Sequence, residues 1–409
     1  MKLKQIRNTI LIGALIAAAF GAGWRLNQVY RKYKLGVPNL SSPVSFTQSE
    51  LFTEVYQLLN QSYLEKDKLK DQEQLLYGSV QGMVAALGDP YTVFLPPKDN
   101  QQFKEDMAGS FDGVGIELGY KDGQLAVIAP LEGTPAQKAG IKSGDIIIHI
   151  KDEQKSFDQD SLNLSLAEAV EIIRGPKGSS VSLTLARKGE TEPIKIEITR
   201  DEIIIPRVTL EVISKGEQEI AHIKLARFGD NTIEQWDEVV EQIKPLAENN
   251  TFAGIVLDLR NNPGGYLDGA VYIASEFISQ GVIVHQESGA GNRQTFSVDH
   301  QGQLTQVPLV VIVNQGSASA AEIVAGALKE QRGTVIVGQT TFGKGTIQQS
   351  QDLDNSASIH ITIARWLLPS GAQIHEQGIT PDIEIDDNLD TEEDEILQAA
   401  LDQLIGNQL

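Results

Sequence analysis

The chain has 409 residues, which is room for two or three domains, and 41% of them are apolar, enough for a folded core. Its 55 acidic residues outnumber its 34 basic residues and give a formal net charge of −21, which argues against a nucleic-acid-binding protein, because such proteins need basic surface to meet phosphates. The chain has no cysteine, which excludes thiol catalysis, disulfides and cysteine-ligated metal sites.

The first 45 residues have the form of an export signal followed by a linker. Lys2, Lys4 and Arg7 precede residues 10–24, which carry no charge, and a positive stretch before an apolar run is typical of such a signal. The run is short for a membrane span, which needs about 20 apolar residues. We favour a retained signal-anchor, the transmembrane helix of a single-pass protein in a bacterial-type cell membrane. Cleavage near residues 17–22, which would give a secreted protein, stays open.

Two regions of different periodicity follow. Residues 47–87 have the apolar spacing of helices, and Thr47 and Glu50 match a capping box. From about residue 111, short β-type runs between turns predict strands, and a helix at residues 166–173 with Ser165 as its cap interrupts them. The expected strands cover residues 114–118, 125–129, 146–150, 181–187 and 194–199.

After Pro206, strand-type and helix-type segments alternate, which indicates an α/β layer with buried parallel strands. The expected strands cover residues 220–225, 254–259, 282–285, 309–313 and 334–337, and the expected helices cover residues 233–246, 267–278 and 320–329. An acid-rich stretch at residues 382–395 leads into a terminal amphipathic helix with Thr391 as its predicted cap.

A turn of small residues, 314–319, joins a buried-type strand to a helix. Free backbone N–H groups point outward at a helix N-terminus, so a serine in this turn would have a ready oxyanion site beside it. Ser317 and Ser319 are the candidates. Ser319 also fits a plain N-cap, because Glu322 follows three residues later, and on this segment alone that alternative stays open.

A nucleophilic serine needs a base. The chain has six histidines, and none stands in a recognisable triad motif, although distance along the sequence excludes none of them. A free lysine titrates near ~10.4, and burial can lower its pKa toward the value of about 7–8 that suits a base. Lys344 is the natural candidate because glycines flank it, and Gln348, four residues on, could orient it through a hydrogen bond.

Lys344 also ends a G-x-x-x-x-G-K sequence at residues 338–344, which is the pattern of a phosphate-binding loop. Gly345 stands where a serine or threonine should hold magnesium, and no apolar helix pattern follows. A nucleotide site is therefore the weaker interpretation.

Residues 258–265 follow another buried-type strand. Their paired glycines could aim a backbone N–H at a substrate carbonyl, or they could form a plain strand-to-helix turn in which Asp258 and Arg260 are a structural pair. Histidines and carboxylates nowhere show metal-ligand spacing.

Together these motifs resemble one family, the carboxy-terminal processing or tail-specific proteases, which are PDZ-containing serine peptidases with a Ser–Lys site. The resemblance covers roughly residues 48–385 and its segments occur in the family's order. The matching segments are GDPYT (88–92), LDLRNNPGG (257–265), GSASAAE (316–322), TFGKGTIQ (341–348) and GITPD (378–382).

The resemblance implies a role for each matching residue. Ser319 would be the nucleophile, Lys344 the general base, and Gln348 the residue that orients the lysine. The oxyanion hole would consist of the backbone N–H groups of Ala320 and Gly265. The resemblance implies no metal, nucleotide or other cofactor.

The segment at residues 112–118 resembles the carboxylate-binding loop of a PDZ module. Gly113, Val114, Gly115 and Ile116 would hold the terminal carboxylate of a substrate while its chain adds to the sheet as a strand. Arg174 is a weaker candidate for coupling this tail binding to the protease core, and it could equally be an ordinary cation at a helix C-terminus.

We therefore expect a multidomain α+β serine endopeptidase that recognises the apolar C-terminal tails of protein substrates. It would bind the membrane through its N-terminal segment, keep its protease domain outside the cytoplasm and bind no nucleic acid. Copies could assemble through the helical terminal segments, or an adaptor could join them. A PDZ scaffold that only binds tails is the alternative from another class. The expected parts are a signal-anchor and linker (1–45), an N-terminal helical region (46–108), a PDZ domain (109–201), an α/β protease core (202–387) and an acidic C-terminal helix (388–409).

Overall fold

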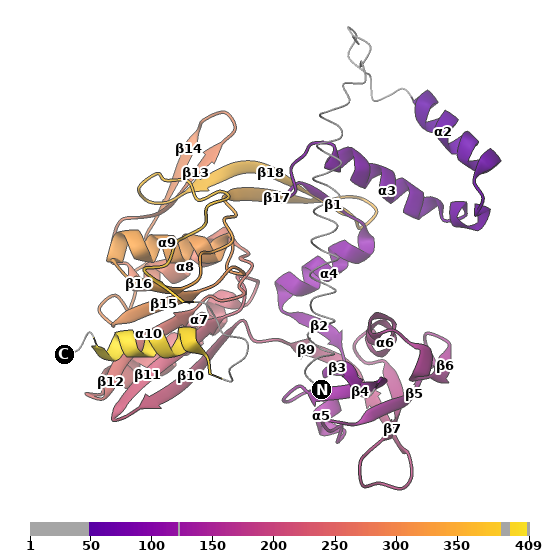
Figure 1. Cartoon of the computed structure of the whole chain (residues 1–409), viewed down its shortest axis with the longest axis horizontal. Coiled ribbons are helices and arrows are strands. Elements are labelled where there is room, and N and C mark those ends of the chain that lie inside the picture. Colours follow the sequence, from indigo (N-terminus) through magenta and orange to yellow (C-terminus); the bar gives the residue numbers. More distant parts are fainter. Residues whose placement is uncertain (1–48, 122, 386–392, 407–409) are drawn as a thin grey trace. The chain divides into compact units, whose positions relative to one another are not determined.

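The computed structural model describes residues 49–121, 123–385 and 393–406, and Figure 1 labels their helices and strands. The chain forms two compact units, residues 1–76 and residues 77–409. The described part of the first unit contains α2 (Ser49–Ser62), η1 (Lys66–Leu69) and the first residues of α3 (Gln72–Ala85). The predicted N-terminal helical segment is therefore confirmed, while its predicted cap, Thr47, lies outside the described residues.

The predicted single-pass membrane location is corrected by the structure. No helix within residues 49–121, 123–385 and 393–406 is long and apolar enough to cross a bilayer. The longest helix in these ranges, α7 (Thr232–Ala247), has 16 residues, whereas a span needs about 20 apolar ones. The apolar run at residues 10–24, on which the prediction rested, lies outside the described residues.

The second unit contains a strand and a helix that the sequence patterns did not predict. β1 (Val93–Leu95) pairs with β18, and α4 (Pro97–Ala108) follows it. Proline is favoured in the first turn of a helix, and Gly109, with φ of 72°, ends α4 in the left-handed conformation. The apolar stripe that would have predicted α4 is weak, because most of its 12 residues are polar.

Residues 116–199 form a β domain around one apolar core. Its strands follow the order β3-β4-β5-β7-β8, with β6 paired to β5, so β3 lies at an edge of the sheet. The antiparallel pair β2 (Ser110–Gly113) and β9 (Asp201–Ile204) flanks the domain in the sequence. The other elements are β3 (Ile116–Lys121), β4 (Gln124–Pro130), α5 (Pro135–Lys138), β5 (Ile146–Asp152), β6 (Phe157–Asp160), η2 (Ser161–Asn163), α6 (Leu166–Ile173), β7 (Ser180–Ala186) and β8 (Ile194–Thr199).

Two predictions in this domain have different outcomes. α6 spans the predicted residues, and its capping box is formed, because Glu168 N–H donates to Ser165 Oγ at 3.3 Å and Ser165 N–H donates to Glu168 at 2.8 Å. The strand expected at residues 114–118 instead begins at Ile116. Gly115 has a φ of 78°, and an extended strand cannot continue through that left-handed conformation.

The C-terminal domain is the predicted α/β layer. Its central sheet has the order β10-β11-β12-β15-β16-β19, and from β11 to β19 neighbouring strands are parallel. Alternate side chains face opposite layers: Ile255 and Leu257 pack with α7, α8 and α9, whereas Val256 packs with α10. Figure 1 shows α10 on the face of the sheet opposite to α8 and α9. The elements are β10 (Val208–Lys215), β11 (Gln218–Leu225), β12 (Phe252–Asp258), α8 (Leu267–Phe277), β15 (Leu309–Val313), α9 (Ala320–Arg332), β16 (Val335–Gly338), β19 (Ile383–Glu384) and α10 (Glu395–Gly406).

A second sheet joins segments that are far apart in the sequence. Its order is β1-β18-β13-β14, and β17 pairs with the other edge of β18. The strand predicted at residues 282–285 belongs to this sheet and pairs antiparallel to β18, so it is not one of the parallel strands. The strands are β13 (Val282–Ser288), β14 (Arg293–Ser297), β17 (Thr346–Asp352) and β18 (Ser358–Leu367).

A buried ion pair joins Arg200, which follows β8, to the last residue of β5. The side chains of Arg200 and Asp152 are both fully buried and hydrogen bonded, and Arg200 also donates to Ile173 O at 2.8 Å. We expect Asp152→Ala to lower the free energy of unfolding of the domain by about 3–5 kcal/mol, because it leaves a buried guanidinium unpaired. Glu153→Ala, which changes the exposed neighbour, should leave it nearly unchanged. Urea denaturation of both variants would test this, and equal stabilities would contradict it.

Candidate active site

A pocket of about 790 Å³ lies beside the start of α9. The loops that follow β12 and β15 both reach it, because the carboxyl ends of parallel strands meet at one edge of a sheet. This pocket brings together all five residues predicted for catalysis and for the oxyanion hole. They are Gly265, Ser319, Ala320, Lys344 and Gln348.

Ser319 stands at the turn between β15 and α9 in a strained backbone conformation. Its φ of 55° and ψ of −115° are rare for a residue with a side chain, and such strain concentrates at functional sites. Glu322 accepts a hydrogen bond from the Ser319 N–H at 2.8 Å, as the capping-box pattern predicts. An ordinary N-cap, however, has an extended backbone, as Ser165 does with φ of −68° and ψ of 158°.

Ser317, the other candidate, is a structural residue. Its side chain is buried, and its Oγ donates to Leu259 O at 2.7 Å while it accepts from Asn314 N–H at 3.0 Å. The hydroxyl therefore ties the turn after β15 to the end of β12. Of the two serines, only Ser319 lines the pocket.

Lys344 contributes a partly buried amine to the same pocket. Burial lowers the pKa of Lys344 below its ordinary value, and the charges of Glu322 and Asp89 oppose that shift. Its Nζ lies 5.2 Å from the centroid of the Tyr91 ring, and within the described part of the chain it forms no ion pair. Lys344 and Ser319 line one pocket, but no hydrogen bond joins their side chains.

Glu322 holds the serine turn and the lysine loop together, a role the sequence patterns did not predict. Its buried carboxylate accepts hydrogen bonds from Thr341 Oγ1 at 2.6 Å, Gly343 N–H at 2.7 Å and Lys344 N–H at 2.9 Å, in addition to Ser319 N–H. Burial raises the pKa of Glu322, although these hydrogen bonds favour its ionised form. An acid among the apolar residues of α9 was the signal that could have identified it.

The paired glycines after β12 come close to the serine turn. A Cβ on Gly264 would lie 2.7 Å from Ser319 Cβ, and one on Gly265 would lie 1.9 Å from Phe228 O, so no larger residue fits at either position. The Gly264 N–H is already bonded to Asn262 Oδ1 at 2.9 Å. In contrast, the N–H groups of Gly265 and Ala320 donate no hydrogen bond within residues 49–121, 123–385 and 393–406, and both residues line the pocket.

Three family models match the chain: "Peptidase family S41" over residues 219–385, "PDZ domain" over residues 127–187 and "Activating protease CtpB N-terminal domain" over residues 27–98. The chain is 33% identical over 389 residues to the carboxy-terminal processing protease CtpB of Bacillus subtilis, covering 93% of this chain and 78% of the relative. It is 34% identical over 394 residues to the carboxyl-terminal-processing protease of Synechocystis, covering 90% of each. This chain belongs to the carboxy-terminal processing proteases of peptidase family S41.

A solved S41 protease from Bacteroides fragilis has the same fold, with a TM-score of 0.53, 15% identity and coverage of 79% of this chain and 88% of that one. The predicted resemblance and the multidomain α+β class, with helical segment, PDZ domain and α/β protease core, are thus confirmed. The protein is a serine-type peptidase with a PDZ domain. The exact domain boundaries stay predictions.

Gln348 of this S41 protease does not bond to the lysine it was predicted to orient. Its Nε2 donates to Thr346 Oγ1 at 2.9 Å and to Thr362 Oγ1 at 3.2 Å. These two bonds fix the amide beside Lys344. Its Oε1 accepts no hydrogen bond from the described residues.

His360 is the histidine that lines the protease pocket, together with Phe103 of α4. The two rings make an edge contact with centroids 4.5 Å apart, and His360 Nε2 lies 3.2 Å from Ser350 Oγ. Burial and the charge of Lys344 lower the pKa of His360, and Asp352 opposes the shift. Among the described residues that line the pocket His360 is the one histidine, which makes it a competing candidate for the base.

The loop predicted to bind substrate tails lies between β2 and β3. Gly113 ends β2, Ile116 begins β3, and Val114 and Gly115 connect them. The N–H groups of Val114 and Gly115 donate no hydrogen bond within the described ranges. Arg174, the predicted coupling residue, pairs with Glu105 at 3.0 Å and lies 4.1 Å from the Phe111 ring, so it contacts the segment that leads from α4 into the PDZ domain.

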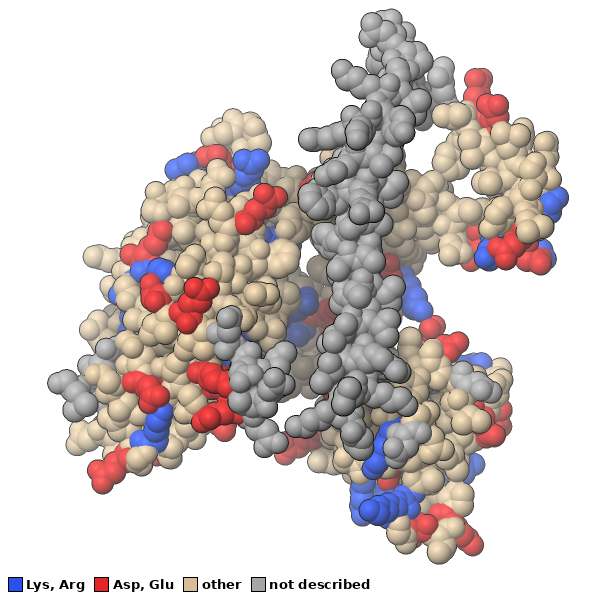
Figure 2. Space-filling model, viewed as in Figure 1, with Lys and Arg blue, Asp and Glu red and all other residues tan. Residues whose placement is uncertain are grey.

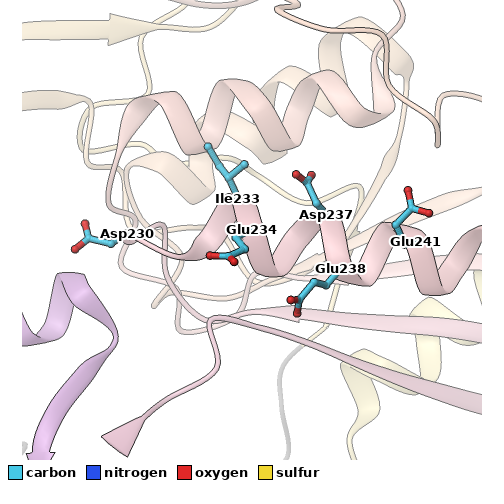
Figure 3. Close-up of a pocket in the computed structure, with 6 residues that line it drawn as sticks. All are labelled: Asp230, Ile233, Glu234, Asp237, Glu238 and Glu241. Carbon is cyan, nitrogen blue, oxygen red and sulfur yellow. The ribbon is translucent and has the colours of Figure 1, made fainter. Parts of the chain in front are cut away.

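The phosphate-binding interpretation of Lys344 fails in this structure. A phosphate-binding loop leads into a helix. Lys344 instead leads into strand β17. Carboxylates of α7 line a second, open hollow, as Figure 3 shows. Figure 2 shows acidic and basic side chains interspersed on the face that it presents. Within the described residues, no cluster of histidines and carboxylates is arranged to hold a metal ion.

Proposed function

We propose that this protease cleaves protein chains with Ser319 as nucleophile and Lys344 as general base. The observation that carries the proposal is a partly buried lysine without an anionic partner among the described residues, in the same pocket as a serine at a strained helix N-terminus. A lysine acts as a base in its neutral form, and burial favours that form by lowering the pKa of the amine.

In the proposed reaction, neutral Lys344 takes the proton from Ser319 Oγ as the oxygen attacks the substrate carbonyl. The N–H groups of Gly265 and Ala320 stabilise the oxyanion of the tetrahedral intermediate, and their unused donors support this role. The Lys344 ammonium then protonates the departing amine, which leaves an acyl-enzyme on Ser319. A water molecule, deprotonated by Lys344, hydrolyses the ester and restores the serine.

The side chains must approach each other for this reaction, since Ser319 and Lys344 do not hydrogen bond in the structure. Catalytic hydrogen bonds tighten when substrate is bound, and both residues have rotatable side chains. Gln348 supports the approach, because its unused Oε1 can accept from Lys344 while Thr346 and Thr362 hold its amide nitrogen.

We further propose that the PDZ domain binds the apolar C-terminal tail of the substrate. β3 is an edge strand, which lets an extended tail add to the sheet beside α6. The N–H groups of Val114 and Gly115 point to no partner among the described residues, and with that of Ile116 they would bind the terminal carboxylate. Cleavage would then take place upstream of the captured tail.

The first test uses the full-length chain and an unstructured protein that ends in alanines and valines. We expect Ser319→Ala and Lys344→Ala to lower kcat on the order of 10³-fold or more, because the reaction then lacks its proposed nucleophile or its proposed base. His360→Gln should retain cleavage. Mass spectrometry of the products gives the readout. Cleavage by Ser319→Ala would refute the nucleophile, and loss of cleavage only in His360→Gln would transfer the role of base. A PDZ scaffold without activity would leave the protein intact in every sample.

The second prediction concerns pH. A base must be deprotonated, so kcat/KM should rise as pH increases through the pKa of Lys344. Because burial lowers that pKa, the midpoint of the rise should lie below the roughly 10.4 of a free lysine. Asp89→Asn removes a negative charge that stabilises the ammonium, so the profile should move to lower pH. A pH–rate series on both proteins measures this, and a midpoint at the value of free lysine would exclude Lys344 as the base.

The third prediction concerns tail capture. A Cβ on Gly115 would lie 2.4 Å from the Thr134 side chain, and its φ is +78°. We expect Gly115→Ala to raise KM for the tailed protein without changing cleavage of a short peptide, because only the long substrate uses the PDZ loop. Gly123→Ala is the matched control, since Gly123 has φ of +81° with nothing within 4 Å. Equal slowing of both substrates by Gly115→Ala would contradict capture by this loop.

A further inference from the structure

We propose that the C-terminal helix α10 positions the oxyanion loop, residues 258–265, through Asp394 and Arg260. Both are positioning residues rather than catalytic ones, and their role rests on the proposed function of Gly265. The loop begins at the end of β12 and ends at the glycines beside Ser319, so its starting point affects where the Gly265 N–H lies.

Arg260 is held between two carboxylates. Its guanidinium donates to Asp394 through two parallel hydrogen bonds of 2.7 and 2.9 Å, the paired geometry that gives a guanidinium both strength and direction. Its Nε and second terminal nitrogen donate to Asp258 at 3.0 and 2.8 Å. The Arg260 side chain is only 15% exposed. All the nitrogens of the guanidinium are therefore engaged.

Asp258 fixes the opposite end of this arrangement. It is the last residue of β12 and is buried, and it accepts from His222 Nε2 of β11 at 3.1 Å and from the Arg260 N–H at 3.0 Å. Burial by itself would raise the pKa of Asp258, but His222 and Arg260 lower it below the ordinary value. A charged Asp258 therefore anchors both the backbone and the side chain of Arg260.

Asp394 is placed by the packing of α10. Its Oδ1 accepts the Leu397 N–H at 2.9 Å, which caps the first turn of the helix. The apolar residues of α10 then pack on the face of the central sheet opposite to α9. These residues are Ile396, Ala400, Leu401 and Leu404. Burial of that face sets the position of Asp394, which holds the Arg260 guanidinium together with Asp258.

The loop passes this constraint to the serine turn through backbone contacts. Asn261 N–H donates to Asn314 Oδ1 at 2.9 Å, and Asn262 O accepts from Ala318 N–H at 2.9 Å. The buried Asn262 side chain also donates to Leu225 O at 2.7 Å and accepts from Gly264. A shift of Arg260 would therefore move the peptide groups that lead to Gly265.

The experiment compares two acids of α10 in the full-length chain. Asp394→Asn keeps an oxygen that can cap the helix but removes the charge that Arg260 needs. Asp402→Asn is the matched control, because Asp402 also joins α10 to the core through an ion pair, with Lys215 at 2.6 Å, and lies away from the loop. The readouts are kcat and KM on an alanine- and valine-containing peptide, inhibition by a peptide aldehyde, and amide hydrogen exchange of residues 258–265.

We expect Asp394→Asn to lower kcat about tenfold with little change in KM, because small misplacements of a catalytic group act on the transition state. The aldehyde, whose adduct carries an oxyanion, should bind more weakly, and the loop should exchange faster. Asp402→Asn should match the wild type in all three. Equal kcat and equal exchange in Asp394→Asn and Asp402→Asn would overturn the positioning role of Asp394. If Ser319→Ala were inactive in the same assay, the proposed function would still stand. Full cleavage by Ser319→Ala would overturn both.

Discussion

The site depends on the hydrogen bonds that the buried carboxylate of Glu322 accepts. It accepts hydrogen bonds from the backbone of Ser319, Gly343 and Lys344 and from the side chain of Thr341. An unpaired buried carboxylate is very costly, so each of these donors is needed where it is. One side chain in the first turn of α9 thus determines both where the serine turn begins and how the lysine loop approaches it.

The same burial sets the chemistry. The chain carries a net charge of −21, and a lysine on such a surface would stay protonated, since surrounding carboxylates favour the ammonium. The pKa of Lys344 is nevertheless lowered, because desolvation outweighs the attraction of Glu322 and Asp89. Glu322 therefore has two opposed effects on the lysine: it fixes the backbone of the loop, and its charge holds the proton more tightly. The balance between them decides the pH range in which the base is available.

The parallel sheet supplies the scaffold on which these groups meet. The loops after β12 and β15 emerge at one edge and carry the glycines and the serine, and a hydrogen bond from Ala318 N–H to Asn262 O joins them. Helices cover both faces of the sheet. Asp394, at the start of α10 on the far face, therefore contacts the oxyanion loop by its hydrogen bond with Arg260. The PDZ domain uses a different principle, an open sheet edge at β3, which suits a partner that arrives as an extended chain.

Local patterns in the sequence were sufficient for the elements whose residues interact with near neighbours. Apolar periodicity located β15, α6 and α9. The small residues of the serine turn identified Ser319 as a candidate nucleophile, and the glycines around Lys344 identified that lysine as a candidate base. They failed for α4, whose stripe is weak, and for the β17–β18 hairpin, whose first strand is mostly polar and exposed and so lacks an apolar alternation. β13 was identified as a strand but assigned to the wrong sheet, because periodicity reports burial and not the neighbour.

The sequence by itself determined the family, the domain types and which residues carry reactive groups, since those depend on residue identity and local spacing. Only the tertiary structure decided that Ser317 is a structural hydroxyl, that Glu322 links two loops, that Gln348 bonds to threonines and that Asp394 reaches Arg260. Each of these depends on hydrogen-bond geometry between segments that are distant in sequence. Burial, which lowers the pKa of Lys344, likewise arises only when those segments pack together.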